Sequence, residues 1–139
     1  MNGYSTTLQN ITLHGARAVR DKAMESANQL GIAVSVFVVD LKGVVILAET
    51  MDGAPPGASD SALMKARGAA RYRAPTHLTA EFVKTLPAQL AQHALSLPEL
   101  CAFQGGVPIK IGDDMVGGLG VAGGSGVQDV EIASGAALI

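Results

Sequence analysis

Glycine is concentrated in one stretch of this 139-residue chain, and that stretch constrains the fold more than any other feature. Nine of the 17 glycines lie in the 22 residues from Gly105 to Gly126. A strand with so few side chains permits very close approach of another backbone, a helix or a ligand. Residues 118–123 also spell GxGxxG. A dinucleotide site needs this pattern between a strand and a helix, whereas these glycines fall within an expected strand. We therefore expect close packing there, against a ligand or another subunit.

The first part of the chain has the signals of a helix followed by a β-hairpin. Thr12 is a helix N-cap and Gly31 a C-terminal stop, so a helix is expected to end at Leu30. Small residues recur every four positions on one face of this helix, at Gly15, Val19, Ala23 and Ala27. Ile32–Val39 is rich in β-branched residues, which predicts a strand buried on both faces. Val44–Met51 is the return strand, after a turn at residues 40–43.

Helices dominate the middle of the chain. Residues 52–59 form a loop rich in glycine and proline. Ser59 or Asp60 is expected to cap a helix that runs to about Tyr72, just before Pro75. Residues 76–95 predict one or two short helices, broken at Pro87.

Short strands and one helix complete the chain. The three expected strands are Glu99–Gln104, Val107–Ile111 and Met115–Ala122. Ser125 and Gln128 have the spacing of a capping box, which predicts the start of a final helix. The sequence therefore predicts a single α/β (α+β) domain over residues 1–139, in which helices pack on a five-stranded antiparallel sheet.

Charge and composition exclude several function classes. Ten Lys and Arg against 12 Asp and Glu give a net charge of −2, without the basic excess of a nucleic-acid-binding protein. Residues 1–10 lack a basic segment followed by an apolar one, and the longest apolar run is too short to span a bilayer. We expect a cytoplasmic protein without nucleic-acid or membrane partners. Cys101 is the only cysteine, so no intrachain disulfide forms, and its apolar surroundings suggest packing rather than reactivity.

Cations and a glycine pair are the first candidate site residues. Lys65, Arg67, Arg71 and Arg73 lie within nine residues. Such residues usually form a solvated surface, but Arg73, close to the end of a helix, can also reach a carboxylate. Gly123 and Gly124 precede the last helix, where free N–H groups favour an anion. The alternative is that these glycines only make a tight turn.

Histidines and acids give further candidates. None of the three histidines has a histidine partner at zinc-site spacing. His14 lies on the polar side of the first helix, where it is solvated or supplies the single protein ligand that a haem needs. Asp52 either orders its loop or faces a pocket, and Asp129 opens the last helix, where an acid also suits the helix dipole.

The chain resembles the GlcG/HbpS-like family of haem-binding and haem-degrading-type proteins, which is related to the C-terminal domain of some cobalamin adenosyltransferases. The resemblance rests on the order and spacing of short motifs over nearly the whole chain. These are Thr12-Leu13, residues 31–43 (GIAVSVFVVDLKG), residues 51–55 (MDGAP), residues 62–70 with Lys65-Ala66, residues 73–76 (RAPT), residues 104–109 (QGGVPI) and residues 116–129 (VGGLGVAGGSGVQD).

The resemblance implies a profilin-like fold and a homo-oligomer, as a dimer, tetramer or octamer. It also implies haem or another tetrapyrrole near subunit contacts in several members. Many members lie among genes of small organic acid or aromatic catabolism.

Two functional hypotheses follow. In the first, the chain binds haem or a similar carboxylate-bearing molecule near subunit interfaces. His14 is then the axial ligand, and Arg71, Arg73, Gly123 and Gly124 receive carboxylates.

In the second hypothesis, the chain is a small lyase, isomerase or hydratase that needs no cofactor and acts on an organic-acid or aromatic catabolic intermediate. Asp52, Lys65 and Arg73 supply catalytic groups, while Gly105, Gly106 and Asp129 complete the pocket. A third alternative is an accessory protein whose glycine-rich strand packs against another subunit. The sequence leaves open whether the chain is an enzyme.

Overall fold

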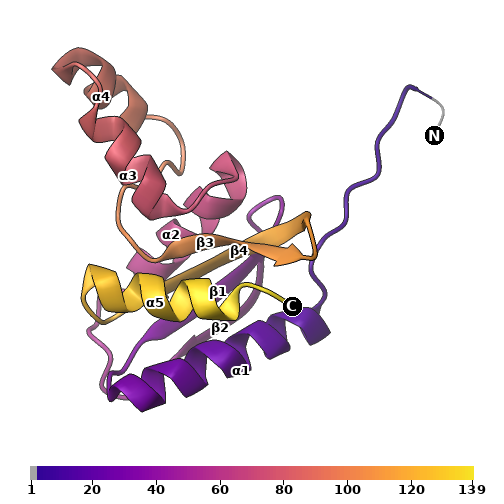
Figure 1. Cartoon of the computed structure of the whole chain (residues 1–139), viewed down its shortest axis with the longest axis vertical. Helices are drawn as coiled ribbons and strands as arrows, with labels where there is room; N and C mark the ends of the chain where they lie inside the picture. Colours follow the sequence, from indigo (N-terminus) through magenta and orange to yellow (C-terminus); the bar gives the residue numbers. More distant parts are fainter. Residues whose placement is uncertain (1–2) are drawn as a thin grey trace.

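The chain folds into one antiparallel sheet with helices on both faces. A computed structural model describes residues 3–139, and its elements are shown in Figure 1. In chain order they are α1 (Leu13–Leu30), β1 (Ser35–Asp40), β2 (Val45–Thr50), α2 (Ala58–Tyr72), α3 (Thr76–Lys84), α4 (Ala88–Leu95), β3 (Gly106–Ile111), β4 (Asp114–Ala122) and α5 (Gly126–Ala136). The predicted α+β class, the first hairpin and the helix break at Pro87 are confirmed.

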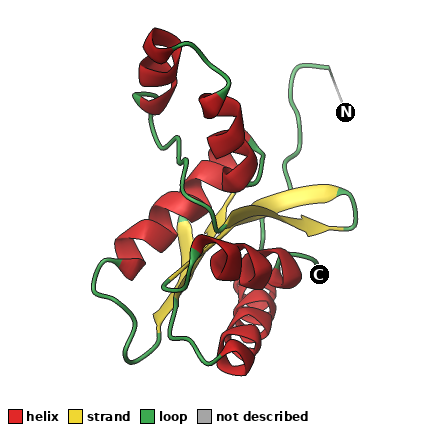
Figure 2. Ribbon diagram, turned by 60° about the vertical axis from the view of Figure 1, so that its left-hand side comes forward, coloured by secondary structure: helices red, strands yellow, loops and turns green. Residues whose placement is uncertain are grey.

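The sheet has four strands in the order β2-β1-β4-β3, and every neighbouring pair is antiparallel. Figure 2 shows α2 on one side of the sheet and α1 with α5 on the other. Val36 and Val38 of β1 belong to the core under α1 and α5, whereas Val39 packs with residues of α2. The prediction that this strand is buried on both faces is therefore confirmed.

The predicted fifth strand, residues 99–104, is wrong. Glu99 adopts a left-handed conformation with φ of 60°, and residues 101–105 have no strand geometry. The segment crosses α2 at Gly68, where an added Cβ would lie 2.8 Å from the Cβ of Cys101. Cys101 is 2% exposed, so its apolar surroundings come from packing on a helix rather than from a strand.

Local capping signals explain both ends of α1 and the start of α5. The Thr12 side chain accepts a hydrogen bond from the Gly15 N–H at 3.0 Å, and Gly31 closes α1 in the left-handed conformation. The capping box of Ser125 and Gln128 is present at the start of α5. The predicted cap of α2 is wrong, because this helix begins at Ala58 after Gly57 and has no side-chain cap.

The glycines of β4 admit the backbone of α2. A methyl group at Gly120 would overlap the carbonyl oxygen of Ala62, and one at Gly118 would overlap that of Ala66. In β3, a methyl group at Gly106 would overlap the carbonyl oxygen of Lys65. The partner that approaches the glycine-rich strand is thus a helix of the same chain.

Helices α3 and α4 project from the sheet in Figure 1. No residue of α4 is buried, and Phe82 of α3 is exposed. Among the helices of residues 3–139, none is both long and apolar enough to cross a membrane.

We predict that Gly120→Ala destabilises the fold by about 3 kcal/mol, because the added methyl group must push α2 away from β4. Gly135→Ala in the last turn of α5 is the control, since an added Cβ there contacts nothing within 4 Å and alanine has a higher helix propensity than glycine. The control should be neutral or more stable by up to about 1 kcal/mol. Urea denaturation measures both variants, and equal stabilities would contradict the packing described.

Candidate functional site

An open cleft lies between α2, the loop at residues 102–104 and the start of α5. Its volume is about 700 Å³. We call it the α2–α5 cleft. Its lining residues are Pro55, Gly57, Ala58, Ser61, Lys65, Ala102, Phe103, Gln104, Ala122–Val127 and Asp129. The least exposed polar residues of this lining, Lys65 and Asp129, form its floor.

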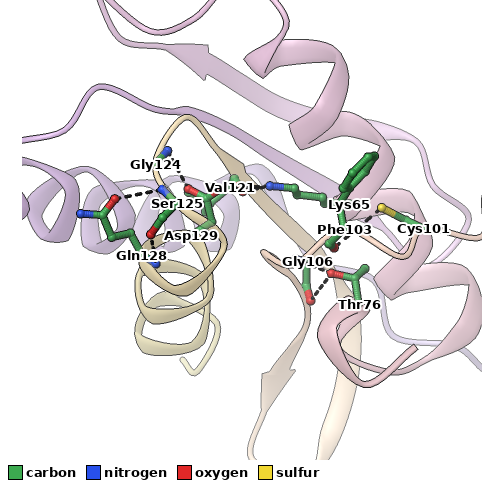
Figure 3. Close-up of polar contacts among 10 residues, drawn as sticks. All are labelled: Lys65, Thr76, Cys101, Phe103, Gly106, Val121, Gly124, Ser125, Gln128 and Asp129. Carbon is green, nitrogen blue, oxygen red and sulfur yellow. Dashed lines mark hydrogen bonds and ion pairs between the residues drawn. The ribbon is translucent and has the colours of Figure 1, made fainter. Parts of the chain in front are cut away.

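Lys65 is buried on the face of α2 that packs on the sheet, and it is 4% exposed. Its Nζ donates to the carbonyl oxygen of Val121 at 2.9 Å and to Oδ2 of Asp129 at 3.1 Å (Figure 3). An ammonium group has three N–H bonds. The third finds no hydrogen-bond acceptor among residues 3–139, so Lys65 keeps one donor unused.

Asp129 joins the two sides of the cleft. Its Oδ1 accepts a hydrogen bond from the Gly124 N–H at 2.9 Å, while Oδ2 accepts from Lys65. The carboxylate therefore holds the connection between β4 and α5 against α2. It is 3% exposed, so each charge of the pair depends on the other for compensation.

The start of α5 presents backbone donors beside this pair. The Ser125 N–H donates to Oε1 of Gln128, and the Gln128 N–H donates to Oγ of Ser125. The N–H groups of Gly126 and Val127 have no hydrogen-bond acceptor within the described part of the chain. Because α5 begins here, its dipole adds a partial positive charge to the cleft.

Apolar side chains stand at the rim of the cleft. Phe103 is 66% exposed and Val127 is 75% exposed. Gln104 lies close to the start of α5, because an added Cβ at Gly126 would be 2.6 Å from its Oε1. The cleft thus combines a charged floor with an exposed apolar rim.

Two glycines beside the cleft have structural roles. Gly105 has a φ of 120°, and an added Cβ would lie 2.5 Å from the carbonyl oxygen of Val121 and 3.1 Å from Nζ of Lys65. The Gly106 N–H donates to Oγ1 of Thr76 at 2.9 Å. Glycine at these positions makes room for the Lys65 ammonium and for the α2 backbone.

The structure brings five of the predicted site residues together, namely Lys65, Gly105, Gly123, Gly124 and Asp129. Gly106 is adjacent to them and packs on α2. The sequence did not identify Ser61, Thr76, Phe103 or Gln104 as residues of the candidate site. Of these, Phe103 could have been identified from the sequence, because it is one of only five aromatic residues and lies two positions before Gly105-Gly106.

The other predicted site residues lie elsewhere. Asp52 is exposed in the turn after β2 and does not line the cleft. Arg71 is exposed, 3.8 Å from a carboxylate oxygen of Glu99. Arg73 ends α2 with a φ of 56° and lines a second groove of about 830 Å³. His14 is exposed on α1, which packs on the opposite face of the sheet from α2. Their functional roles stay predictions.

Cys101 does not offer a reactive thiol to the cleft. It is 2% exposed, and burial raises the pKa of its thiol, which disfavours the nucleophilic thiolate. Within residues 3–139, no group of three or more His, Cys, Asp or Glu side chains is arranged to hold a metal ion.

Fold and site together define a small α+β protein with a buried Lys–Asp ion pair on the floor of an open cleft. A family model described as "Haem degrading protein HbpS-like" matches residues 11–137. The chain belongs to this HbpS-like family, as the sequence motifs predicted.

Individual relatives agree with this assignment. The chain is 30% identical over 128 residues to the corrinoid adenosyltransferase PduO of Salmonella typhimurium. This alignment covers 92% of the present chain but only 38% of PduO. A double mutant of HbpS from Streptomyces reticuli has a TM-score of 0.86 and 33% identity, and the alignment covers 99% of this chain and 91% of that one. A PduOC–haem complex has a TM-score of 0.81 and 29% identity, with coverages of 91% and 92%.

We predict that removing either charge of the pair destabilises the protein by about 3–5 kcal/mol, because the remaining charge stays buried without compensation. Lys65→Met tests one side and Asp129→Leu the other. The double variant Lys65→Met/Asp129→Leu should recover most of this loss. Urea denaturation of the four proteins completes a double-mutant cycle, and additive effects would show that the ion pair is absent in solution.

Proposed function

We propose that this protein binds a small carboxylate-bearing organic molecule in the α2–α5 cleft. The observation that carries the proposal is the buried Lys65, which lines the cleft with one N–H bond unused within residues 3–139. A buried N–H bond that has no acceptor costs free energy, and a ligand oxygen would supply an acceptor for the third N–H of Lys65.

The surroundings of Lys65 favour a carboxylate. The N–H groups of Gly126 and Val127 and the α5 dipole add donors and partial positive charge on the same side of the cleft. The exposed rings and branches of Phe103 and Val127 suit an apolar part of the same molecule. A volume of about 700 Å³ lies within the ordinary range of small-molecule sites.

Haem is the second candidate, favoured by the family description and by the haem complex of PduOC. Haem needs an axial ligand, usually from His, Cys, Met or Tyr. None of these residues lines the α2–α5 cleft. His14 fits as a ligand only if a second subunit provides the remaining walls, since it lies on an exposed helix surface. Bound haem would supply iron-centred chemistry, while His14 would fix its position.

The proposal is tested by titrating ¹⁵N-labelled protein with pyruvate, 2-oxobutyrate and benzoate. We expect the amide resonances of Gly124, Gly126 and Val127 to shift, because a carboxylate would sit beside them. The variant Lys65→Met/Asp129→Leu should bind at least about tenfold more weakly, which corresponds to the loss of one charge-assisted hydrogen bond. Lys42→Met is the matched control, because Lys42 is exposed in the β1–β2 turn away from the cleft.

Haemin is added as a separate ligand in the same series. A Soret shift that disappears in His14→Ala but persists in His93→Ala would favour the second candidate. If no carboxylate shifts the amide resonances and haemin gives no Soret shift, small-molecule binding is contradicted both in the α2–α5 cleft and at His14.

A further inference from the structure

The floor of the α2–α5 cleft places an acid and a base side by side. Nζ of Lys65 is 3.1 Å from Oδ2 of Asp129, and both residues are more than nine-tenths buried. Each carboxylate oxygen accepts one hydrogen bond within the described residues, from Gly124 to Oδ1 and from Lys65 to Oδ2. A carboxylate offers about four acceptor positions, so Asp129 can still receive a proton.

We propose that this pair catalyses proton exchange at the carbon next to the carbonyl group of a small 2-oxo acid. Asp129 acts as the base, and Lys65 donates its unused N–H to the carbonyl oxygen. The inference rests on the proposed function, because the carboxylate of the same molecule must first bind in the cleft.

The step balances without any further reactant. The C–H bond next to the carbonyl breaks, and its proton passes to a carboxylate oxygen of Asp129. The electron pair of that bond forms a C=C bond, while the C=O π electrons move to the oxygen and give an enolate. Lys65 stabilises this oxygen by a hydrogen bond that strengthens as negative charge develops. Return of a proton from Asp129, after exchange with water in the open cleft, restores the ketone.

The position of the donors selects the substrate class. Asp129 follows Gly126 by three positions in α5, which is a rise of roughly 4.5 Å along the helix axis. The Asp129 carboxylate also accepts from the Gly124 N–H at 2.9 Å, so it lies at the start of α5. A carboxylate bound at the Gly126 N–H would therefore place an adjacent carbonyl group close to the ion pair. A short apolar tail on the third carbon would extend toward Phe103 and Val127 at the rim. These relations describe short 2-oxo acids with an apolar tail.

Other side chains of the cleft are less suited to the chemistry. Oγ of Ser125 is occupied in the capping box, where it accepts a hydrogen bond from Gln128. The carboxylate of Asp129 accepts from Gly124 and Lys65 rather than from the Ser61 hydroxyl. Proton transfer by Asp129, assisted by Lys65, is the reaction that the existing contacts support.

The experiment follows the loss of the C3 proton signal of 2-oxobutyrate in D₂O by ¹H NMR. The full chain should accelerate this loss at least about 100-fold over buffer, within the range of general acid–base catalysis. Asp129→Asn keeps a hydrogen-bonding oxygen but removes the base, so it should reduce the rate at least about 100-fold. Lys42→Met should retain the full rate, and circular dichroism confirms that each variant is folded.

The outcomes separate the two proposals. Carboxylate binding without accelerated exchange overturns the catalytic inference and leaves the proposed function intact. Absence of carboxylate binding overturns both. If Asp129→Asn does not fold, Lys65→Met/Asp129→Leu replaces it, at 2-oxobutyrate concentrations high enough to saturate its weaker binding. An undiminished exchange rate in either folded variant overturns the inference. Loss of exchange with binding of 2-oxobutyrate retained supports it.

Discussion

The backbone of α2 packs directly on the glycines of β4, and this contact positions the other elements of the site. Carbonyl oxygens of Ala62 and Ala66 lie where side chains of Gly120 and Gly118 would otherwise stand. Because α2 lies so close to β4, the Lys65 side chain of α2 contacts the carbonyl oxygen of Val121 and the carboxylate of Asp129 in α5. Glycine in the strand thus determines where the ammonium group lies.

The ion pair is not explained by stability alone. Two well-packed apolar side chains often stabilise a core as well as a buried ion pair does, because desolvation of the charges offsets their attraction. Here the pair also holds Gly124 through Asp129 and leaves one Lys65 donor unused within residues 3–139. An ion pair that lines an open cleft with spare hydrogen-bonding capacity suits a ligand, and this is the basis of both proposals.

Local signals predicted local structure well. The Thr12 cap, the Gly31 stop and the capping box of Ser125 lie within a few residues of the elements they control, so the sequence was sufficient for α1 and α5. The predicted strand at 99–104 was wrong because apolar Cys101 packs on α2, which is a tertiary contact. The partnership of Lys65 and Asp129 spans 64 residues and depends on that same packing, so spacing along the chain did not reveal it. From the sequence, both residues were predicted for the site, but together with Asp52 and Arg73, which lie elsewhere in the structure.

If a carboxylic acid binds in the α2–α5 cleft, it contacts the Lys65 ammonium group, and ¹H–¹⁵N NMR of lysine side chains can detect this contact. A buried, hydrogen-bonded ammonium exchanges slowly enough with water to be observed, and Lys65→Met assigns its resonance by its absence. Addition of 2-oxobutyrate should shift this resonance with the same midpoint as the amide shifts of Gly126 and Val127. A saturable shift of these amides with an unchanged Lys65 resonance would contradict the account.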